Sequence, residues 1–406
     1  MESTQRRPRL LYITTHGMAA ASLMRGQLAM LRDRGFDVTV VSTPCEELDL
    51  VARREGVATI AVPMDREITP LRDLRTLLRL YRIIRQVNPD IVNCGTPKAG
   101  VLGTVAAWLA RVPTRIYTLR GLRLETTSGL KHGILSWAER LASACAHVVI
   151  CVSFSIRDEY LARRLTAEKK CRVLASGSSN GIHPERFQRS DERLRQSSQL
   201  REQLGIPPDA PVMGFVGRMT RDKGIVELAG AYAAVLVDFP DTRLLLVGDF
   251  EQGDPVPEAV TASLQENSRV VITGFTDEPE LYYPMMDVLA FPSWREGFPN
   301  VPLEASAAGI PTVGFAATGT RDAVVDGVTG TLVPVGDTDG LAVALQKYLS
   351  DDVIRFRHGQ AGQRRVSEEF RSETVWTALC ELYNSQLPEH LRPAAIPEDT
   401  GLRRVA

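Results

Sequence analysis

Short apolar runs rich in β-branched residues alternate with helical patterns along most of the chain. In the first half these runs cover residues 9–15, 37–43, 59–64, 90–95, 114–120 and 147–153. Neighbouring parallel strands need long crossover connections, usually helices, and a parallel sheet is buried on both faces. The alternation therefore predicts a parallel sheet with helices packed on both of its faces.

The alternation stops and then begins again. A polar stretch that ends in a proline-rich turn, RFQRSDERLRQSSQLREQLGIPPDAP, occupies approximately residues 185–210. A second set of strand-like runs follows, at residues 212–218, 242–249, 269–275, 287–293, 311–316 and 330–336. A chain of 406 residues has room for two domains of ordinary size. We therefore predict an α/β protein with two doubly wound, Rossmann-like domains.

The predicted boundaries follow from where the pattern breaks. The first domain covers residues 1–190, a linker covers 191–210, and the second domain covers 211–366. A helix and tail, residues 367–406, are expected to pack back on the first domain.

Composition excludes several classes of function. The formal net charge is -1, so bulk charge does not favour binding to nucleic acid. Six cysteines are scattered without a C-x-x-C pair or a Cys/His cluster, which predicts buried thiols and no metal site. The N-terminal stretch lacks the apolar core of a signal peptide, and no run of about 18 apolar residues occurs. We expect a cytoplasmic protein without a membrane span.

The segment GFVGRMTRDKG, residues 214–224, places two cations at the end of a predicted strand. Arg218 follows the strand directly, Lys223 comes five residues later, and a helical pattern begins after Gly224. A helix N-terminus offers free N–H groups and the positive end of a dipole, which add to side-chain charge. The segment is typical of a diphosphate site, and the alternative is an ordinary solvated loop.

Two glutamates stand eight residues apart in REGFPNVPLEASAAG, residues 295–309. Pro302 is tolerated in a first helical turn, and Asn300 suits the capping position before it. The pattern therefore places Glu304 in the first turn of a helix and Glu296 in the preceding loop. Carboxylates accept paired hydrogen bonds from vicinal hydroxyls, so both residues suit a sugar or a ribose. As an isolated pair, they would more simply be a helix-end charge and a surface residue.

A third segment, ATGTRDAVVDGVTGTLVP, covers residues 317–334 and contains glycines suited to a loop that passes close to a ligand. The D-x-D sequence of Asp337 and Asp339 suits a turn better than a metal site.

Together and in this order, these segments resemble the retaining family-four glycosyltransferases of the GT-B fold. The resemblance covers nearly the whole chain, is strongest over residues 212–340, and depends on the R-x₄-K and E-x₇-E spacings. The segment NCGTPKAGVLGTVAAWLARVPTRIYTLRGLR is similar to members that build bacterial surface glycans on lipid carriers. The resemblance implies two domains facing a cleft, the first binding an acceptor and the second a nucleotide sugar.

The family's site residues can be assigned to matching positions. Glu296 matches the glutamate beside the transferred sugar, Glu304 the one that holds the ribose, and Arg218 with Lys223 the diphosphate pair. Other implied donor contacts come from Gly17, Gly217, Gly274, Phe275, Phe298, Pro299 and Asn300. His16 is implied on the acceptor side, and Asn180-Gly181-Ile182 match the N-G-[IV] segment before the linker.

One departure lies in the first domain. Many family members carry a histidine in a T-x-H stretch near the reacting sugar, and here the stretch reads Thr118-Leu119-Arg120. Arginine stays protonated and cannot act as a base, but it can stabilise a leaving phosphate or bind an acidic acceptor. Thr96 and Lys98, at a strand end, could receive the diphosphate of an acceptor, and the alternative is a solvated loop or a structural ion pair.

The resemblance implies transfer of a hexose or N-acetylhexosamine from a nucleotide sugar, UDP-linked in our prediction, to a lipid-linked or polysaccharide-precursor acceptor. It implies retention of anomeric configuration without a metal or other cofactor. Arginines recur every three or four residues on one predicted helix, opposite leucines, at Arg72, Arg75, Arg79, Arg82 and Arg85. Such a face suits peripheral contact with the inner surface of the plasma membrane, and the alternative is a solvated helix face.

Two other functions remain open at this point. A nucleotide-sugar epimerase of the same architecture would need a further acid/base set, which the motifs do not supply. A non-catalytic subunit that binds nucleotide sugars or glycans is favoured only by the missing histidine. A nicotinamide oxidoreductase is disfavoured because ITTHGMAAAS stands where G-x-G-x-x-G would follow the first strand.

Overall fold

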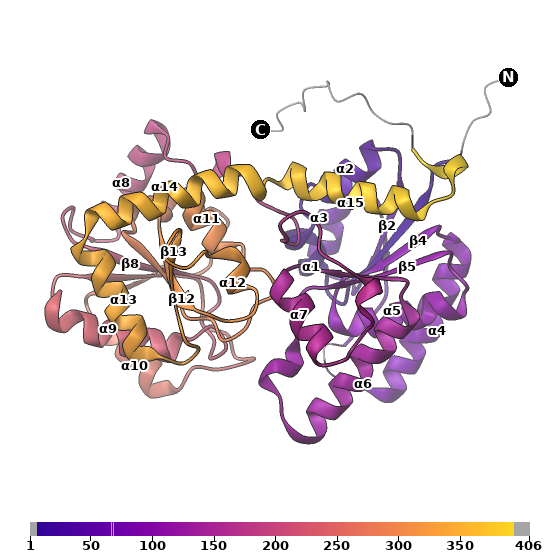
Figure 1. Ribbon diagram of the computed structural model, residues 1–406, viewed down its shortest axis with the longest axis horizontal. Coiled ribbons are helices and arrows are strands. Elements are labelled where there is room, and N and C mark those ends of the chain that lie inside the picture. The colour runs from indigo at the N-terminus through magenta and orange to yellow at the C-terminus, as the bar shows by residue number, and fades with distance from the viewer. Residues whose placement is uncertain (1–5, 66, 68, 394–406) are drawn as a thin grey trace.

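The computed structural model describes residues 6–65, 67 and 69–393, which form two α/β domains side by side (Figure 1). Each domain is built on one parallel sheet, as predicted. The first sheet has the strand order β3-β2-β1-β4-β5-β6-β7 and the second β10-β9-β8-β11-β12-β13. In both sheets the strand order reverses beside the first strand of the domain, at β1/β4 and at β8/β11. Ligands of open α/β sheets bind at such switch points, beyond the carboxyl ends of the strands.

The strands lie where the apolar runs predict them. Their bounds are β1 Arg9–Ile13, β2 Asp37–Ser42, β3 Ala58–Ala61, β4 Ile91–Cys94, β5 Thr114–Leu119, β6 Val148–Cys151, β7 Cys171–Arg172, β8 Val212–Val216, β9 Arg243–Val247, β10 Val270–Ile272, β11 Val288–Phe291, β12 Thr312–Phe315 and β13 Gly330–Val333. Only β7 was missed among the described strands, because two residues at a sheet edge produce no periodic signal.

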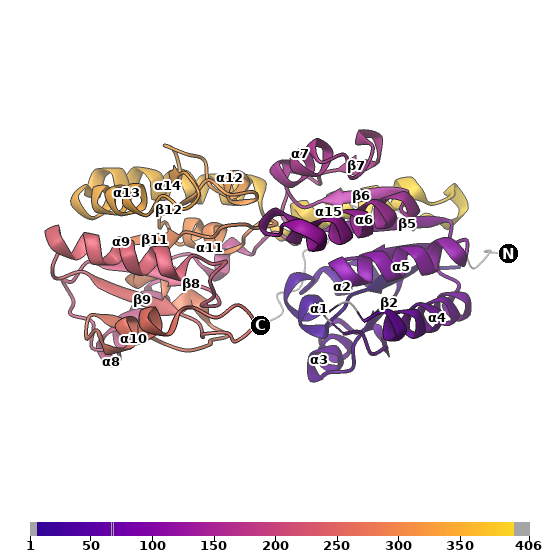
Figure 2. The ribbon, with the colours of Figure 1, turned by 90° about the horizontal axis from the view of Figure 1, so that it is seen from below.

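The helices cover both faces of each sheet (Figure 2). Their bounds are α1 Gly17–Leu23, α2 Gln27–Asp33, α3 Glu46–Glu55, α4 Pro70–Val87, α5 Pro97–Leu109, α6 Gly129–Cys145, α7 Phe154–Ala162, α8 Asp191–Gln203, α9 Ile225–Asp238, α10 Glu258–Glu266, α11 Val301–Ala307, α12 Thr320–Ala323, α13 Thr338–Ser350, α14 Asp352–Glu369 and α15 Ser372–Gln386. In the described part of the chain, no helix combines the length and the apolar character needed to cross a bilayer.

The segment predicted as a linker contains a helix. Residues 191–203 form α8, whose N-cap Ser190 accepts a hydrogen bond from the Arg193 amide at 3.2 Å. Asp191 and Glu192 in the first turn favour the positive end of the helix dipole. The helix contacts the short 3₁₀ turns Pro279–Leu281 and Tyr283–Met285, so it packs on the second domain. The polar composition of this stretch concealed these helix signals.

The last helix returns to the first domain. From α14, which packs on α11, the chain continues into α15 along the upper side of both domains (Figure 1). Leu379, Cys380, Tyr383 and Leu387 join the core formed by the first sheet and α2. The Tyr383 hydroxyl lies 2.6 Å from the Tyr12 hydroxyl of β1. Residues 394–406, the rest of the predicted tail, lie outside the described residues.

Candidate active site

The candidate donor residues lie at the switch point of the second sheet. β8 and β11 are neighbours, and the loops that follow them carry Arg218 and Lys223 on one side and Glu296 on the other. The carboxyl ends of parallel neighbours meet at one edge, which brings residues more than 70 positions apart into contact. The Lys223 ammonium lies 2.5 Å from Glu296 Oε1, with both side chains largely buried.

Ser293 completes the environment of Glu296. Its hydroxyl donates to Glu296 Oε1 at 2.7 Å, so this oxygen is held by Ser293 and Lys223 together. Nearby, Arg295 bonds Asp222 at 3.0 Å and links the loop after β11 to the loop after β8. Motif spacing did not identify Ser293 or this second ion pair, because both depend on how the two loops fold together.

Arg218 lies at the edge of a pocket of about 350 Å³. The pocket is lined by residues at or after the ends of β8, β9 and β10: Val216, Gly217, Arg218, Val247, Gly248, Asp249, Glu251, Phe275, Thr276 and Pro279. Arg218 forms an ion pair with Glu251 at 2.7 Å, a partner that the sequence did not reveal.

Glycines allow the strand ends around this pocket to approach one another. Gly248 has a φ of 142°, and a Cβ placed there would lie 2.0 Å from the Gly217 carbonyl oxygen. Gly274 has a φ of 77° and lies beside Asp249, whose carboxylate accepts from the Phe275 amide at 2.9 Å. Phe275 is largely exposed and presents an aromatic face at the pocket.

Glu304 occupies the first turn of α11, as its position after Pro302 predicts. The Tyr283 hydroxyl donates to Glu304 Oε2 at 2.7 Å. Burial raises the pKa of Glu304, while the Tyr283 hydroxyl and nearby Arg186 act in the opposite direction. Asn300 is the N-cap residue of α11, as predicted, but its side chain makes no capping hydrogen bond.

The segment between the two glutamates is anchored by packing. Phe298 is buried, and its ring centroid lies 5.2 Å from that of Phe370 at the end of α14. Gly177 of the first domain lies against the Phe298 ring, where a Cβ would approach to 3.1 Å. Pro299 is also buried beside it. Phe298 therefore serves the junction between the domains in addition to any contact with a donor.

In the first domain, Arg120 extends into the interior. Its guanidinium lies by Tyr12 and Tyr383, and burial lowers its pKa. Its Nη1 atom is buried and has no hydrogen-bond partner among the described residues. The side chain borders a hollow of about 20 Å³ that Asn93 and Thr118 also line. The backbone carbonyl of Arg120, by contrast, faces Gly297 of the second domain.

Thr96 and Lys98 are both engaged within the first domain. The Thr96 hydroxyl accepts from the Thr15 amide at 2.9 Å and lies 2.7 Å from the Thr15 hydroxyl. Lys98 forms an ion pair with Asp73 of α4 at 2.6 Å, and its side chain is only 12% exposed. This is the structural ion pair that the sequence left open as an alternative for Lys98.

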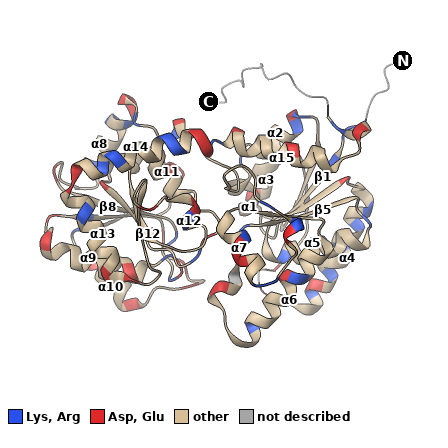
Figure 3. Cartoon of the chain, in the orientation of Figure 1, with Lys and Arg blue, Asp and Glu red and all other residues tan. Residues whose placement is uncertain are grey.

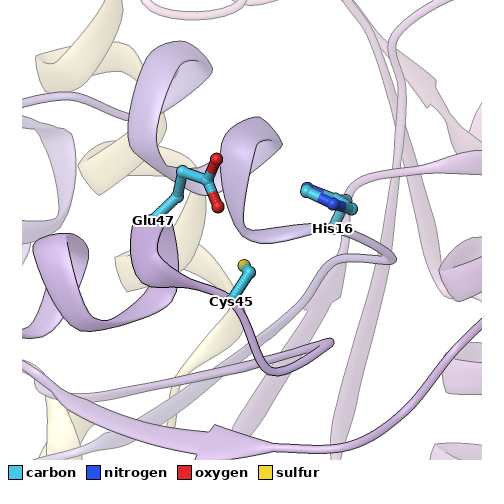
Figure 4. Close-up of side chains that lie close together, drawn as sticks. All are labelled: His16, Cys45 and Glu47. Atoms are coloured by element: carbon cyan, nitrogen blue, oxygen red, sulfur yellow. The ribbon is translucent and has the colours of Figure 1, made fainter.

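His16, Cys45 and Glu47 come together (Figure 4), and Gly17 lies against the Cys45 thiol. Their ligand atoms all lie within 4.8 Å of one another, which is close enough for a metal ion. Each of the first two already has a protein partner: His16 Nδ1 accepts from the Met18 amide at 3.3 Å, and the Cys45 thiol donates to the Thr43 carbonyl at 3.3 Å. Burial and the Glu47 carboxylate raise the pKa of Cys45, which favours the thiol over the thiolate that binds metals.

Comparison with known proteins decides the family. The family model described as "Glycosyl transferases group 1" matches residues 210–351, and the family model described as "Glycosyl transferase 4-like domain" matches residues 18–177. The chain is 37% identical over 367 residues to the capsular polysaccharide biosynthesis glycosyltransferase CapM of Staphylococcus aureus, covering 90% of this chain and 94% of CapM. The chain belongs to the group 1 glycosyltransferases.

Other relatives and solved structures agree with this assignment. The glycosyltransferase is 26% identical over 346 residues to an Escherichia coli α-1,3-galactosyltransferase named for UDP-Gal and GlcNAc-diphosphoundecaprenol, covering 83% and 86% of the two chains. Anabaena HepE, solved with UDP-glucose, superposes with a TM-score of 0.77 at 23% identity over 93% of this chain and 99% of HepE. WaaG, a glycosyltransferase of lipopolysaccharide biosynthesis, superposes with a TM-score of 0.72 at 16% identity over 92% and 99%. The fold of this glycosyltransferase is therefore GT-B.

The glycosyltransferase thus gathers Lys223, Glu296 and Arg218 around one sheet edge, with Glu304 at the start of the next helix. Motif spacing missed their partners Glu251, Tyr283 and Ser293, and the neighbouring ion pair of Asp222 and Arg295. Position at the end of the predicted strand 287–293 was a sequence signal that could have singled out Ser293.

Proposed function

We propose that this glycosyltransferase moves a hexose or N-acetylhexosamine from a UDP-sugar to a lipid-linked or polysaccharide-precursor acceptor of a bacterial surface glycan. The observation that carries the proposal is the pairing of Lys223 with Glu296 at the switch point, next to Arg218 and the 350 Å³ pocket. Relatives support the substrate classes: CapM is named for capsule synthesis, and the E. coli relative for a UDP-sugar and a lipid diphosphate. HepE, of the same fold, was solved with UDP-glucose.

The two side chains proposed to bind the diphosphate each form an ion pair with a carboxylate. Arg218 pairs with Glu251, and Lys223 pairs with Glu296. A diphosphate offers each cation several strong acceptor oxygens, and Arg218, largely exposed, can exchange Glu251 for one. Lys223 can contact the phosphate while Glu296 turns to the hydroxyls of the sugar. Glu304, held by Tyr283, would accept from the ribose hydroxyls, and Phe275 would contact the base.

Breaking the anomeric C–O bond puts negative charge on the departing diphosphate. Fixed cations aimed at the place where charge develops stabilise the transition state. Arg218, Lys223 and the N-terminus of α9 supply positive charge from the protein itself, and we propose a reaction without a metal or other cofactor. We further propose retention: the acceptor attacks on the side of the leaving group, and the departing phosphate takes the acceptor's proton.

In the first domain, we propose that Arg120 contributes a buried cation whose Nη1 has no hydrogen-bond partner among the described residues. A buried charge without a partner is costly, so an anionic group of donor or acceptor would gain from reaching its Nη1. His16 and Thr96 would line the acceptor side. Lys98 is paired with Asp73, so a role on an acceptor diphosphate would require that ion pair to open.

We also propose that the first domain rests on an anionic membrane. All five arginines of the predicted stripe on α4 are exposed. Figure 3 marks the charged positions of this helix. Leucines are exposed among them instead of only opposite, at Leu71, Leu74 and Leu78. On α6, two helices along, an apolar stripe is exposed at Leu130, Ile134 and Trp137. Arginine, tryptophan and leucine on one face suit the interface of a bilayer, where a lipid-linked acceptor resides.

The transfer proposal is tested with the purified protein, a panel of UDP-sugars and lipid-diphosphate acceptors. Wild type should release UDP only when an acceptor is present, whereas an epimerase would act on the donor alone. Lys223→Ala and Glu304→Gln should each lower turnover by at least about a hundredfold, because each removes a contact to the donor. Lys347→Ala, an exposed lysine on α13, is the matched control and should keep full turnover. Full activity in either site variant would refute the assignment.

A further inference from the structure

Loops from both domains meet at the N-terminus of α7. Ser153 is the N-cap of this helix, and its hydroxyl accepts from the Ile156 amide at 3.2 Å. The same hydroxyl donates to the Gly297 carbonyl of the second domain at 2.8 Å. Gly297 directly follows Glu296, so the first domain holds the backbone of the loop that carries the proposed sugar-binding carboxylate.

A carboxylate of the second domain caps the same helix. Asp322, on α12, accepts hydrogen bonds from the Phe154 amide at 2.9 Å and from the Ser155 amide at 3.3 Å. The Ser155 hydroxyl also donates to Asp322. Free N–H groups and the positive dipole end of a helix favour a carboxylate, and such charge-assisted bonds are stronger than neutral ones. Helix caps are normally local, but this one comes from the other domain, 167 residues away.

The two loops of the second domain are also joined to each other. The Glu296 amide donates to the Thr318 carbonyl at 3.1 Å, which joins the loop after β11 to the loop before α12. The next residue of the second loop, Gly319, donates its amide hydrogen to the Ser155 hydroxyl of the first domain at 2.7 Å. A Cβ at Gly319 would lie 2.5 Å from the Gly297 carbonyl oxygen, so only glycine allows these loops to pack this closely. The Ser153 and Ser155 hydroxyls lie 3.5 Å apart and link these bonds into one set, formed by Ser153, Ser155, Gly297, Gly319 and Asp322 and here called the Asp322 clasp.

The clasp is supported from within the second domain. Arg365 of α14 donates to the Asp322 carbonyl at 2.7 Å and to the Ala323 carbonyl at 2.8 Å. These bonds fix the short helix α12 on the long helix α14. Asp322 is thus presented to α7 by a rigid element, and separating the two domains would have to break its bonds to Phe154 and Ser155.

We propose that the Asp322 clasp couples the approach of the two domains to the placement of Glu296. Separation of the domains would break the bonds to Asp322 together with the Ser153–Gly297 bond, so the Glu296 loop is braced by the first domain only when the domains are in contact. Asp322 and Ser155 act on the reaction through Glu296 and are positioning residues. The inference rests on the proposed function. The pocket that holds Arg218 is lined by the second domain alone, so UDP binding should not need the clasp.

The test compares Asp322→Ala, Ser155→Ala and Asp322→Asn in the full chain. Asp322→Ala should lower turnover at least tenfold while the Kd for UDP stays within twofold of wild type. Asp322→Asn keeps an acceptor oxygen and should lose less. Hydrogen exchange at the amides of Phe154 and Ser155 should accelerate in Asp322→Ala. Asp339→Ala, on an exposed position of α13, is the matched control and should change none of these quantities.

A double-variant cycle separates positioning from general destabilisation. Ser155→Ala combined with Asp322→Ala should cost less turnover than the sum of the two single losses, because both variants remove the Ser155–Asp322 hydrogen bond. Ser155→Ala also removes the acceptor of the Gly319 amide, so the double variant can lose somewhat more than Asp322→Ala alone. Unchanged turnover in Asp322→Ala, or a parallel loss of UDP affinity, would overturn the proposal. Absence of UDP binding in wild type would instead refute the proposed function, and hydrogen exchange at α7 would still report whether the clasp exists.

Discussion

The buried side chain of Glu139 should make the stability of the first domain depend on pH. It lies on the inner face of α6, and its carboxyl accepts from the hydroxyls of Tyr117 at 3.1 Å and Tyr160 at 3.0 Å. Burial raises its pKa from 4.5 to about 7, with the two tyrosines acting in the opposite direction. No cation among the described residues forms an ion pair with Glu139. Desolvation therefore outweighs the two tyrosine hydrogen bonds, and the pKa is raised.

The sign of the effect follows from proton binding. Between pH 4.5 and about 7 the folded protein keeps a proton on Glu139 that the unfolded chain has lost. Stability therefore falls as pH rises through this window, by on the order of 3 kcal/mol from this group. Glu139→Gln keeps an acceptor for the tyrosines and removes the titration. Thermal melts from pH 5 to 8 should show a smaller loss of Tm with rising pH in Glu139→Gln than in wild type.

An exposed glutamate provides the control for this prediction. Glu266→Gln, at the end of α10, should reproduce the pH dependence of wild type. If Glu139→Gln also follows the wild-type curve, then Glu139 is ionised in the folded protein at neutral pH and its raised pKa is wrong.

At the scale of elements, α4 and α6 carry the surface proposed for membrane contact. Exposed arginines on α4 supply attraction to anionic headgroups, about 1 kcal/mol for each cation near the surface, and Leu130, Ile134 and Trp137 on α6 supply apolar area. Arg75→Glu with Arg79→Glu should reduce sedimentation with phosphatidylglycerol vesicles at least tenfold. Ile134→Ser with Trp137→Ser should also weaken vesicle binding. The loss of affinity that these two substitutions cause should depend little on salt concentration, because salt does not screen apolar insertion.

The controls for vesicle binding come from the chain and from the lipid. Vesicles of phosphatidylcholine alone should bind the wild type weakly. Val353→Ser with Phe356→Ser changes exposed apolar residues on α14 of the second domain and should leave binding unchanged. Equal binding of wild type and the double-glutamate variant to anionic vesicles would show that α4 is an ordinary solvated helix.

At the scale of the whole molecule, Gly297 marks where the carboxyl ends of the two sheets meet. A Cβ at this position would lie 2.0 Å from the Arg120 carbonyl oxygen, and backbone on both sides leaves no flexible side chain to move aside. Gly297→Ala should therefore displace the Glu296 loop and lower transfer by about a hundredfold, the size of effect expected from a shift of about 1 Å at a reacting centre. Steady-state transfer at saturating donor measures it.

A second glycine substitution controls for the loss of glycine itself. Gly133 on α6 has no atom within 4 Å of an added Cβ, so Gly133→Ala should keep full activity. It should also stabilise the helix by about 0.5–1 kcal/mol. Wild-type turnover in Gly297→Ala would show that the contact between Arg120 and Gly297 is not required for transfer.

Hydrophobic periodicity determined most of the fold at the sequence level. The alternation of apolar runs and helical patterns predicted two parallel-sheet domains, and each run of the second domain became a strand within a few residues of its predicted bounds. The spacing of Arg218 and Lys223, and of Glu296 and Glu304, also predicted which loops carry the candidate site. These features are local: strand period, helix starts and charges beside them depend on neighbours in sequence.

Only the tertiary structure decided which side chains meet. It brought Lys223 to Glu296 across 73 residues, engaged Lys98 with Asp73, and turned Arg120 toward Tyr12 and Tyr383. It also placed Asp322 on α7 of the other domain. Sequence spacing carries no information on such contacts, because they depend on which loops the two sheets present to each other when their carboxyl ends face across the junction.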